Sequence, residues 1–496
     1  MLKYNGCISL TYNITMKQHL RNIVVGLSLT ATVLFALVMI GIRFFALQET
    51  FIYDEVYSWV TANPAIPFST IWHDILLKDV NLPLFNLVLR AWAHVVPFTD
   101  AWLRALSVIF SLLGIAVAWF LAPRSWPKLE KFAFCSLLAG SYGLTNYSHV
   151  VRSYSMGILF TVIFNLLALR ILNAFAQEEK ISWKCWAGFY GAGLIAAYTH
   201  FFACGLFFIT CLFLFFYACA YKRDRALVFW ATALCFFLWV PWLYNTYASL
   251  NHFSSGWWYE TNKVLSSWQI LLFCLGSEWM LGGLLLLLIV GLVSVSFNEK
   301  NILKKRTDVL LPLFQVIMLV AVLLALSGRY NLFTERYFLI TLPSLFILLV
   351  ALWIHLYKRW VGVIVLLPLF LYANTIYHFN YFFPRLTEFS GLTPAFTYVA
   401  DTLHTPKVMV LLDPITYPEA SQWPFVHYFL PKEYPIEVIG VTEENAHQIN
   451  PPESVPVIVP LCSMYRLIML SVKYNFKLPD NLVVFQQSCI AQNPKR

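Results

Sequence analysis

The residues best suited to chemistry in this sequence are two adjacent carboxylates, Asp54 and Glu55, which follow the first long apolar segment and lie among aromatic residues. A carboxylate that lies beside a like charge and is partly removed from water holds a proton more readily, which suits a general base. The other interpretation is the solvated start of a loop. Asp54 and Glu55 are therefore candidate catalytic residues, with both interpretations open.

A second polar group, formed by Lys78, Asp79 and Asn81, precedes Pro83 between two amphipathic stretches. Proline suits the first position of a helix, and Asp79 or Asn81 would be a suitable cap for that helix. Alternatively, Asp79 and Asn81 face a site beneath the loop.

The remaining candidates lie at the predicted outer ends of later apolar segments: Arg152 and Tyr154, then His200, then Arg336 and Tyr337. A guanidinium group matches the geometry of a phosphate. For Arg152 the alternative is contact with lipid headgroups, and for Arg336 it is an ion pair with Glu335. His200 is either a packed, hydrogen-bonded side chain or a substrate contact.

The elements that must position these residues are membrane spans. The chain has 496 residues, of which 59% are hydrophobic, 17% aromatic and 12% charged. A soluble domain carries about 25% charged residues, so this composition excludes a soluble enzyme, and its hydrophobicity excludes a disordered chain. The apolar residues form blocks of about 18 to 25, the length that a bilayer-spanning helix requires. We therefore expect an all-α, multi-pass membrane helical bundle.

About eleven spans are expected. They lie near residues 24–45, 103–121, 132–148, 155–173, 186–200, 202–220, 226–246, 268–296, 309–327, 337–356 and 360–379. The first segment has no small-residue cleavage site behind it, so it is expected to be a retained span rather than a removed signal peptide.

The distribution of charge predicts the topology. Alternate loops are basic, and they contain Arg124/Lys128/Lys131, Lys180/Lys184, Lys222/Arg223/Arg225, Lys300/Lys304/Lys305/Arg306 and Lys358/Arg359. By the positive-inside rule these loops and the N-terminus are cytoplasmic, in a cytoplasmic (inner) membrane protein whose C-terminal region is periplasmic or extracellular. The net charge of +9 therefore reflects topology and contact with anionic membrane lipids, and it requires no nucleic-acid partner.

Two domains are expected. Residues 1–383 form the transmembrane domain, and its long first outer loop at 46–102 carries the amphipathic stretches PFSTIWHDILL and LPLFNLVLRAWAHVV. Trp72 and Trp92 would place these stretches in the membrane interface. Residues 384–496 form a small extracytoplasmic α/β domain, because short β-rich runs (VMVLLD, IEVIGV, VPVIVP, NLVVF) alternate with Pro-rich turns and helical stretches such as YRLIMLSVKYNF.

The cysteines give little chemistry. Most of the ten lie in or beside predicted spans, where they would pack as small apolar groups. Cys462 and Cys489 lie in the C-terminal region, and whether they form a disulfide is left open. No C-x-x-C or H-E-x-x-H motif points to a structural metal.

The candidate residues, taken in order, resemble a family. The motifs are Asp54-Glu55, Asp79-Val80-Asn81-Leu82-Pro83-Leu84-Phe85, Arg104-Ala105-Leu106-Ser107, Arg152-Ser153-Tyr154, Tyr198-Thr199-His200-Phe201 and Arg336-Tyr337. Over roughly residues 20–350 this series is similar to the polyprenol-phosphate-dependent C-type glycosyltransferases, in the branch of the protein O-mannosyltransferases and lipid A aminoarabinose transferases. Asn81 stands where the family has histidine, and Leu82 where it has proline, which puts the role of position 81 in doubt.

The resemblance implies an inverting membrane glycosyltransferase that moves a sugar from a polyprenyl-phosphate carrier to an acceptor at the outer face of the membrane. Asp54 would take the proton of the acceptor, and Glu55 would position the acceptor or support the pair. Arg152 and Arg336, together with Lys78, would neutralise the leaving phosphate, while His200 and Tyr154 would contact the donor. No cofactor is required, and a divalent cation near Asp54 is left open.

The acceptor would be lipid A or another glycolipid, a polysaccharide of the cell envelope, or a protein. One alternative is a transporter or flippase of a lipid-linked sugar, which would place charged groups near mid-membrane. Another is a non-catalytic assembly protein that presents its outer domain to a partner.

Overall fold

The computed structural model describes residues 2–48, 51, 53–79, 81–253, 270, 272, 306–326, 335–356, 365–388, 408–412, 436–440, 457–459, 482–485 and 488–491. The chain divides into two compact units, and each is described by itself. The first unit comprises Met1–Leu47, Ala105–Pro241 and Tyr259–Phe379, and the second comprises Gln48–Arg104, Trp242–Trp258 and Asn380–Arg496.

Six helices in the described part of the chain are long and apolar enough to cross a membrane: Asn22–Phe45, Asp100–Leu121, Tyr154–Ala176, Phe201–Ala220, Arg225–Asn245 and Thr307–Ala325. They belong to α1 (Leu2–Phe45), α5 (Asp100–Leu121), α8 (Tyr154–Ala176), α10 (Phe201–Ala220), α11 (Arg225–Phe253) and α15 (Thr307–Leu326). All six coincide with predicted spans, which confirms a helical membrane protein. The predicted span at 268–296 lies outside the described residues, so the total of about eleven stays a prediction.

The other predicted spans correspond to further helices. The predicted span at 186–200 corresponds to α9 (Trp183–Thr199), with His200 directly after it. The last two predicted spans correspond to α16 (Glu335–Phe338), η3 (Leu339–Thr341) and α17 (Leu342–Leu356), and to α18 (Leu367–Glu388). Because α18 runs to Glu388, it continues past residue 383, and the predicted domain boundary there stays a prediction.

The predicted single span at 132–148 is divided into α6 (Lys128–Gly140) and α7 (Tyr142–Asn146) by the extended backbone of Ser141. The groups freed by this break have distant partners. The fully buried Arg43 guanidinium donates to the carbonyls of Ala139 at 2.7 Å and Leu138 at 3.2 Å. The Tyr142 N–H donates to Oδ1 of Asn374 at 2.8 Å. The continuous run of apolar residues predicts a single helix, because a local sequence pattern does not show these distant hydrogen-bond partners.

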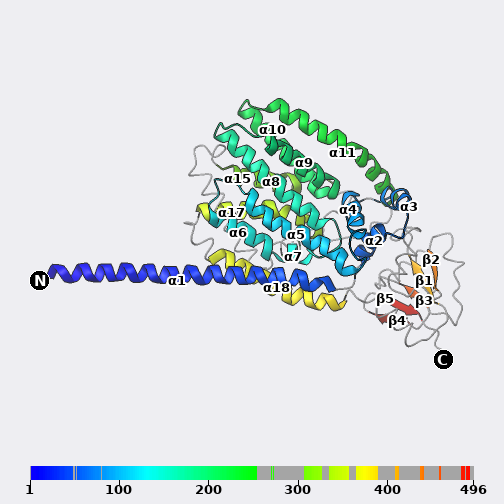
Figure 1. Cartoon of the computed structure of the whole chain (residues 1–496), viewed down its shortest axis with the longest axis horizontal. Coiled ribbons are helices and arrows are strands. Elements are labelled where there is room, and N and C mark those ends of the chain that lie inside the picture. Colours follow the sequence, from blue (N-terminus) through cyan, green and yellow to red (C-terminus); the bar gives the residue numbers. More distant parts are fainter. Residues whose placement is uncertain are drawn as a thin grey trace. The chain divides into compact units, whose positions relative to one another are not determined.

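Helix α8 is the centre of the first unit. It contacts α9, α10, α15 and α17, and Figure 1 shows it running beside α9 and α10. Most of its residues are buried around the whole circumference, which is typical of an interior helix. Inside the bundle, Gln315 donates to Asn165 at 2.7 Å and to Thr210 at 2.6 Å, and Asn165 donates to Ser344 at 2.9 Å. Such hydrogen bonds join transmembrane helices where no water competes.

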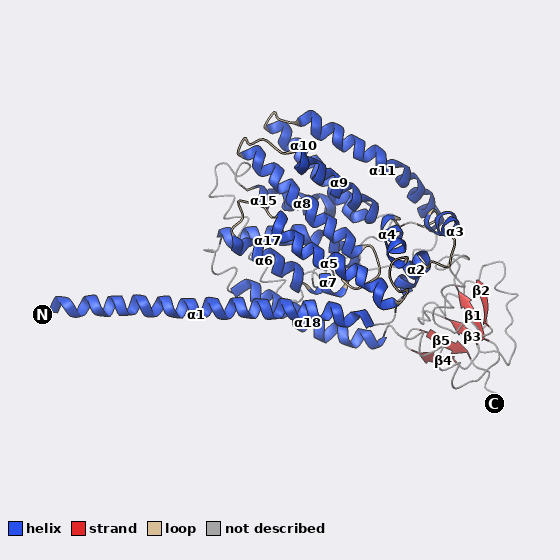
Figure 2. Cartoon of the chain, viewed as in Figure 1, coloured by secondary structure: helices blue, strands red, loops and turns tan. Residues whose placement is uncertain are grey.

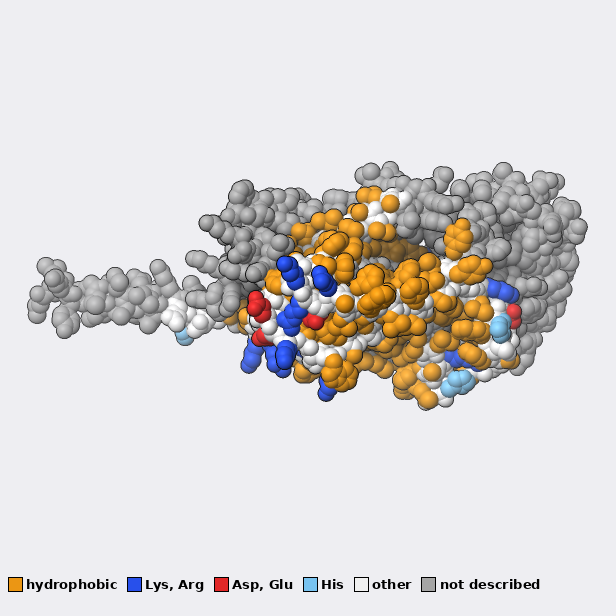
Figure 3. Space-filling model, turned by 90° about the horizontal axis from the view of Figure 1, so that it is seen from above, with side chains coloured by type: hydrophobic (Ala, Val, Ile, Leu, Met, Phe, Trp, Pro, Cys, Tyr) orange, Lys and Arg blue, Asp and Glu red, His pale blue; other side chains and the backbone are white. Residues whose placement is uncertain are grey.

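The C-terminal end of α8 gathers the basic loops. Arg170 donates to the carbonyls of Phe120 and Ala122, Asn173 accepts from Thr307, and the Glu179 carbonyl accepts from Arg223. These bonds bring the α5–α6, α8–α9 and α10–α11 connections and the start of α15 to one side, as the charge pattern predicts. Figure 3 shows most Lys and Arg side chains of one face gathered at one end of a largely hydrophobic surface.

In the second unit, the first outer loop is helical. It contains α2 (Tyr53–Ala62), α3 (Phe68–Thr70), the π-helix η2 (Ile71–Leu76) and α4 (Leu84–Ala93), preceded by η1 (Ala46–Gln48). Both predicted amphipathic stretches form helices, and α4 buries Phe85, Leu89 and Ala93, which are spaced by one turn. Arg90 of α4 donates to the carbonyls of Asn63 at 2.8 Å and Ile66 at 2.7 Å, which ties α4 to the turn after α2.

The C-terminal part of the second unit contains a five-stranded sheet of order β2-β1-β3-β5-β4. Its strands are β1 (Val408–Leu412), β2 (Ile436–Gly440), β3 (Val457–Val459), β4 (Leu482–Phe485) and β5 (Ser488–Ala491), drawn in red in Figure 2. β1 pairs in parallel with β2 and β3, while β5 pairs antiparallel with β3 and β4. Four strands coincide with predicted β-rich runs, whereas β5 was not predicted. The helical stretch at 465–476 lies outside the described residues.

Candidate functional site

Three polar segments of the first unit meet at the N-terminal end of α8, opposite its basic end. Tyr154 is the first residue of α8, His200 separates α9 from α10, and Tyr337 lies in α16. The His200 ring centroid lies 5.6 Å from that of Tyr154 and 6.1 Å from that of Tyr337. The structure therefore brings together three predicted site residues that are far apart in the sequence.

Two arginines accompany these rings. Arg152 is half-buried in the turn that leads into α8, and the half-buried Arg336 has its guanidinium carbon 5.4 Å from the ring centroid of Tyr337. Burial, with the nearby charges of Arg152 and Arg336, lowers the pKa of His200 to about 3. Five of the predicted binding residues thus share one end of the bundle. The predicted alternative partner of Arg336, the Glu335 side chain, lies outside the described residues.

Local sequence explains how the turn before α8 is held. Ser155 donates from its hydroxyl to the carbonyls of Tyr147 at 3.3 Å and Ser148 at 3.2 Å, and the Tyr147 and Tyr154 rings meet edge to face at 5.0 Å. The Arg152 N–H closes a tight turn onto the Val150 carbonyl at 2.7 Å. These short-range contacts fix the backbone that carries Arg152.

His200 is held by a specific hydrogen bond. Its Nδ1 accepts from the N–H of Phe202 at 3.2 Å, and its carbonyl accepts from the N–H of Cys204 at 2.9 Å. These are the bonds of an N-cap residue, so His200 starts α10. The prediction of a packed, hydrogen-bonded histidine is confirmed, and a substrate contact stays a prediction.

The lowered pKa of His200 predicts acid sensitivity. Below its ordinary value of 6.5 the unfolded chain binds a proton that the folded protein refuses until about pH 3. His200 should therefore cost no free energy of unfolding above pH 6.5. Below that pH the free energy of unfolding should decrease as the pH falls through this window. The charged or titratable side chains near the imidazole are those of Arg152, Arg336, Tyr154 and Tyr337.

The measurement is the thermal midpoint in nanodiscs at about pH 7.5 and about pH 5. His200→Asn retains a capping side chain and removes the titrating group, so its midpoint should fall less on acidification than that of the parent chain. Equal acid shifts in the two proteins would contradict this assignment.

In the second unit, Glu55 forms a buried ion pair. Its carboxylate accepts from Nη2 of Arg104 at 2.7 Å, and the two side chains are 0% and 2% exposed. The Arg104 guanidinium also lies over the ring of Phe51, 5.2 Å from its centroid. Glu55 is therefore on a helix in a dry environment rather than in a solvated loop. The sequence indicated Arg104 only as the first residue of a motif at the start of a predicted span, and it did not predict the pair with Glu55.

The buried pair predicts a large effect on stability. Arg104→Ala would leave the Glu55 charge buried without this partner and should lower the free energy of unfolding by about 3–5 kcal/mol. The double variant Glu55→Leu/Arg104→Met should recover most of that loss, because it removes both charges and fills the space. The control is Lys78→Ala, which breaks an exposed pair and should change stability by less than about 1 kcal/mol. Denaturant unfolding measures all three, and a loss below that of the control would refute the prediction.

Asp79 joins α2 to the segment before α4. Its Oδ2 accepts from the Tyr57 hydroxyl at 2.6 Å, and its Oδ1 accepts from Nδ2 of Asn81 at 3.0 Å. Pro83 occupies the N-cap position of α4 with no side-chain capping bond, so the predicted cap by Asp79 or Asn81 is not formed. Tyr57, which the sequence showed only as one of several aromatics, holds this carboxylate.

The other predicted residues of the second unit are less constrained. Lys78 is 66% exposed, and its Nζ lies 3.4 Å from Oδ1 of Asp74, four residues earlier in the chain. Asp54 is the second residue of α2, and its side chain lies outside the described part. The Cys462–Cys489 disulfide likewise concerns residues whose side chains are not described.

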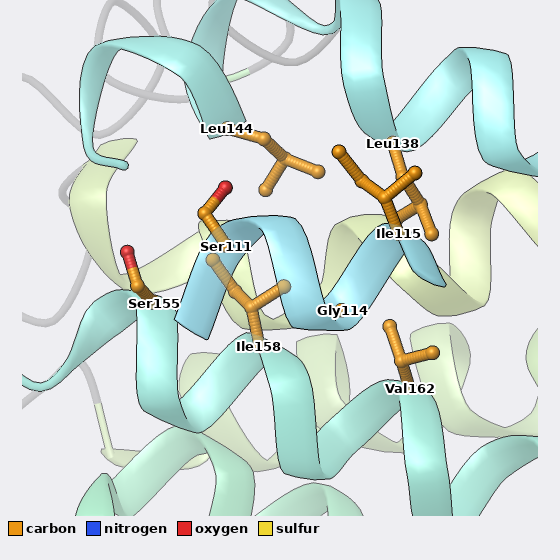
Figure 4. A pocket seen from close by; sticks show the side chains of 8 residues that line it. All are labelled: Ser111, Gly114, Ile115, Leu138, Leu144, Ser155, Ile158 and Val162. Carbon is orange, nitrogen blue, oxygen red and sulfur yellow. The ribbon is translucent and has the colours of Figure 1, made fainter. Parts of the chain in front are cut away.

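A small pocket lies elsewhere in the first unit, among α5, α6, α7 and α8. Figure 4 shows its lining by Ser111, Gly114, Ile115, Leu138, Leu144, Ser155, Ile158 and Val162. None of these eight residues is ionisable, so their side chains offer no charge to balance a phosphate and no acid or base for proton transfer. Among the described residues, no group of three or more His, Cys, Asp or Glu side chains is arranged to hold a metal ion.

Comparisons with known proteins give a structural likeness. No protein-family model and no curated protein matches the sequence. ArnT from Cupriavidus metallidurans in the apo state is 13% identical with a TM-score of 0.55, over 93% of this chain and 97% of that chain. The same protein bound to undecaprenyl phosphate gives 13% and 0.51, over 93% and 98%. The Archaeoglobus fulgidus oligosaccharyltransferase in complex with Zn and sulfate gives 13% and 0.48, over 87% and 68%. The chain is thus a multi-pass membrane protein with the fold of ArnT.

Proposed function

We propose that this protein is a membrane glycosyltransferase that moves a sugar from a polyprenyl-phosphate carrier to an acceptor at the outer face of the cytoplasmic membrane. The observation that carries the proposal is the cluster at the N-terminal end of α8. Two arginines, Arg152 and Arg336, are both close enough to His200 to help lower its pKa to about 3. Paired cations at the end of a membrane helix suit a lipid-linked phosphate.

The fold likeness supports the same class of ligand. ArnT has been crystallised with undecaprenyl phosphate bound, and the present chain has that fold together with a cationic cluster at one end of its bundle. We infer that the phosphate of a polyprenyl carrier binds at Arg152 and Arg336, with the lipid tail in the membrane.

In the proposed reaction, the acceptor oxygen forms a bond to the anomeric carbon of the sugar while the bond from that carbon to the phosphate oxygen breaks. The electron pair of the broken bond stays on the phosphate, and the acceptor proton passes to the Asp54 carboxylate. The phosphate gains one negative charge, which the two arginines stabilise in the transition state. Attack from the face opposite the phosphate inverts the anomeric carbon.

The other predicted residues would support this step. Glu55, through its bond to Arg104, would fix α2 and hence the backbone of Asp54. Asp79 and Asn81 would form the acceptor side, Lys78 would help the two arginines to neutralise the phosphate, and Tyr154 and Tyr337 would flank the donor. The proposed reaction leaves open a divalent cation near Asp54, and none of its steps depends on one.

The orientation is also proposed. The loops gathered at the C-terminal end of α8 carry the basic residues, so this end is assigned to the cytoplasm by the positive-inside rule. The arginine cluster at the other end is then periplasmic or extracellular. The odd number of predicted spans assigns the C-terminal region to the same compartment. The acceptor would be a lipid such as lipid A, an envelope polysaccharide or a protein.

The test is sugar transfer by the full chain in nanodiscs supplied with a panel of labelled polyprenyl-phosphate sugars and with envelope glycolipids or proteins as acceptors. We expect label to appear on an acceptor with one of these donors. Mass spectrometry of envelopes with and without the protein identifies the acceptor independently. Movement of the intact donor between leaflets of vesicles, with no transfer, would instead indicate a flippase and would refute the enzyme.

A further inference from the structure

The choice of histidine at position 200 has a consequence beyond the binding of phosphate. His200 caps α10 through Nδ1, which accepts from the N–H of Phe202 at 3.2 Å. Capping alone favours Asn, Asp or Ser, whose short side chains reach the same backbone N–H. An imidazole adds a second nitrogen on the far side of the ring, so the residue can serve the cap and a second partner together.

The cap bond also fixes where the proton lies. A ring nitrogen that accepts a hydrogen bond carries no proton, so the neutral imidazole holds its proton on Nε2. To become an imidazolium, His200 would have to protonate Nδ1 and break its bond to the N–H of Phe202. Burial opposes the same change, and so do Arg152 and Arg336; together they lower the pKa of His200 to about 3.

We propose that His200 is a fixed, uncharged hydrogen-bond donor of the site: its Nε2–H binds an oxygen of the phosphate-linked donor, and the imidazole neither accepts nor releases a proton during transfer. The inference rests on the proposed function, because it assigns the role of one residue within that site. Tyr154 and Tyr337 hold the ring, with centroids at 5.6 and 6.1 Å from the imidazole.

Two substitutions separate the cap from the donor. The asparagine amide in His200→Asn can accept from the N–H of Phe202 but cannot reach as far as Nε2, so it keeps the cap and loses the distal donor. His200→Gln places an amide N–H near the position of Nε2 and loses the favourable cap. We expect the asparagine variant to keep the parent's thermal midpoint while sugar transfer falls roughly 10- to 100-fold. The glutamine variant should be less stable and yet transfer more sugar than the asparagine variant.

The opposite results would overturn the inference. Transfer by His200→Asn at the parent's rate would mean that the cap is the whole role of the residue. A glutamine variant no more active than the asparagine variant, when both are folded, would mean that the distal N–H is not used.

A spectroscopic measurement tests the assignment without activity. The 15N-histidine spectrum of the full chain in nanodiscs, minus that of His200→Asn, reports the two ring nitrogens of His200. We expect a neutral ring protonated at Nε2 at about pH 5 and about pH 8, with an Nε2 signal that shifts on addition of undecaprenyl phosphate. An imidazolium, a proton on Nδ1 or the absence of that shift would overturn the inference. Failure of the parent chain to transfer sugar, with these spectral results intact, would contradict only the proposed function.

Discussion

Asp54→Asn is expected to lower the rate of sugar transfer by roughly 100- to 10 000-fold, which is the contribution of a general base. The substitution keeps the size of the side chain and removes its ability to take the proton of the acceptor. Asp54 is the second residue of α2, next to Glu55, whose bond to Arg104 fixes the helix. The thermal midpoint should therefore stay close to that of the parent chain.

The matched control for Asp54 is Asp74→Asn, because Asp74 is another carboxylate of the first outer loop and is 48% exposed. It should transfer sugar at the parent's rate. Single-turnover transfer from a labelled polyprenyl-phosphate sugar measures the chemical step directly. A folded Asp54→Asn protein that transfers as fast as the Asp74→Asn protein would remove Asp54 from the mechanism.

Arg152→Ala and Arg336→Ala should each reduce kcat by roughly 100- to 1000-fold, the loss found when one preorganised donor to a developing oxyanion is removed. The charge on the phosphate grows as the bond to the sugar breaks, so each guanidinium binds the transition state more strongly than the donor. The loss in kcat should consequently exceed the loss in affinity for undecaprenyl phosphate, measured by competition with the labelled donor.

Two further variants make this result specific. Arg152→Lys retains a charge without the planar fork, and it should recover part of the loss. Lys184→Ala removes a cation from the basic end of the bundle and should leave kcat unchanged, because that end lies away from the arginine cluster. Equal effects of Arg152→Ala and Lys184→Ala would show that Arg152 contributes only general surface charge.

Much of the architecture was predictable, because what a bilayer requires of a span can be recognised in a short stretch of sequence. A span needs a continuous apolar run, and the six long helices of the described part coincide with such runs. Charged loops are equally local signals, and the basic connections α5–α6, α8–α9 and α10–α11 of the described part do meet at one end of α8. Four of the five strands also follow from short β-rich runs, whereas β5 was missed because SCIA has no clear alternation.

The partners of buried polar groups were not predictable, because they come from distant parts of the chain. Arg43 closes the end of α6 at Leu138 and Ala139, and Asn374 holds the start of α7, so a single apolar run became two helices. The ion pair between Glu55 and Arg104 likewise joins residues that are distant in the chain. The sequence showed only an acidic pair and an arginine at the start of a later span.

The sequence by itself determined that certain residues form a series, because all of them lie at the predicted outer ends of spans: Arg152, Tyr154, His200, Arg336 and Tyr337. Only the tertiary structure decided that the ends of α8, α9, α10 and α16 meet, so that the His200 ring lies within 6.1 Å of the rings of both Tyr154 and Tyr337. It also decided that the imidazole of His200 is buried close to Arg152 and Arg336, which lowers its pKa. Hydropathy fixes the depth of a residue in the membrane, whereas the packing of helices fixes its neighbours, and neighbours set its charge.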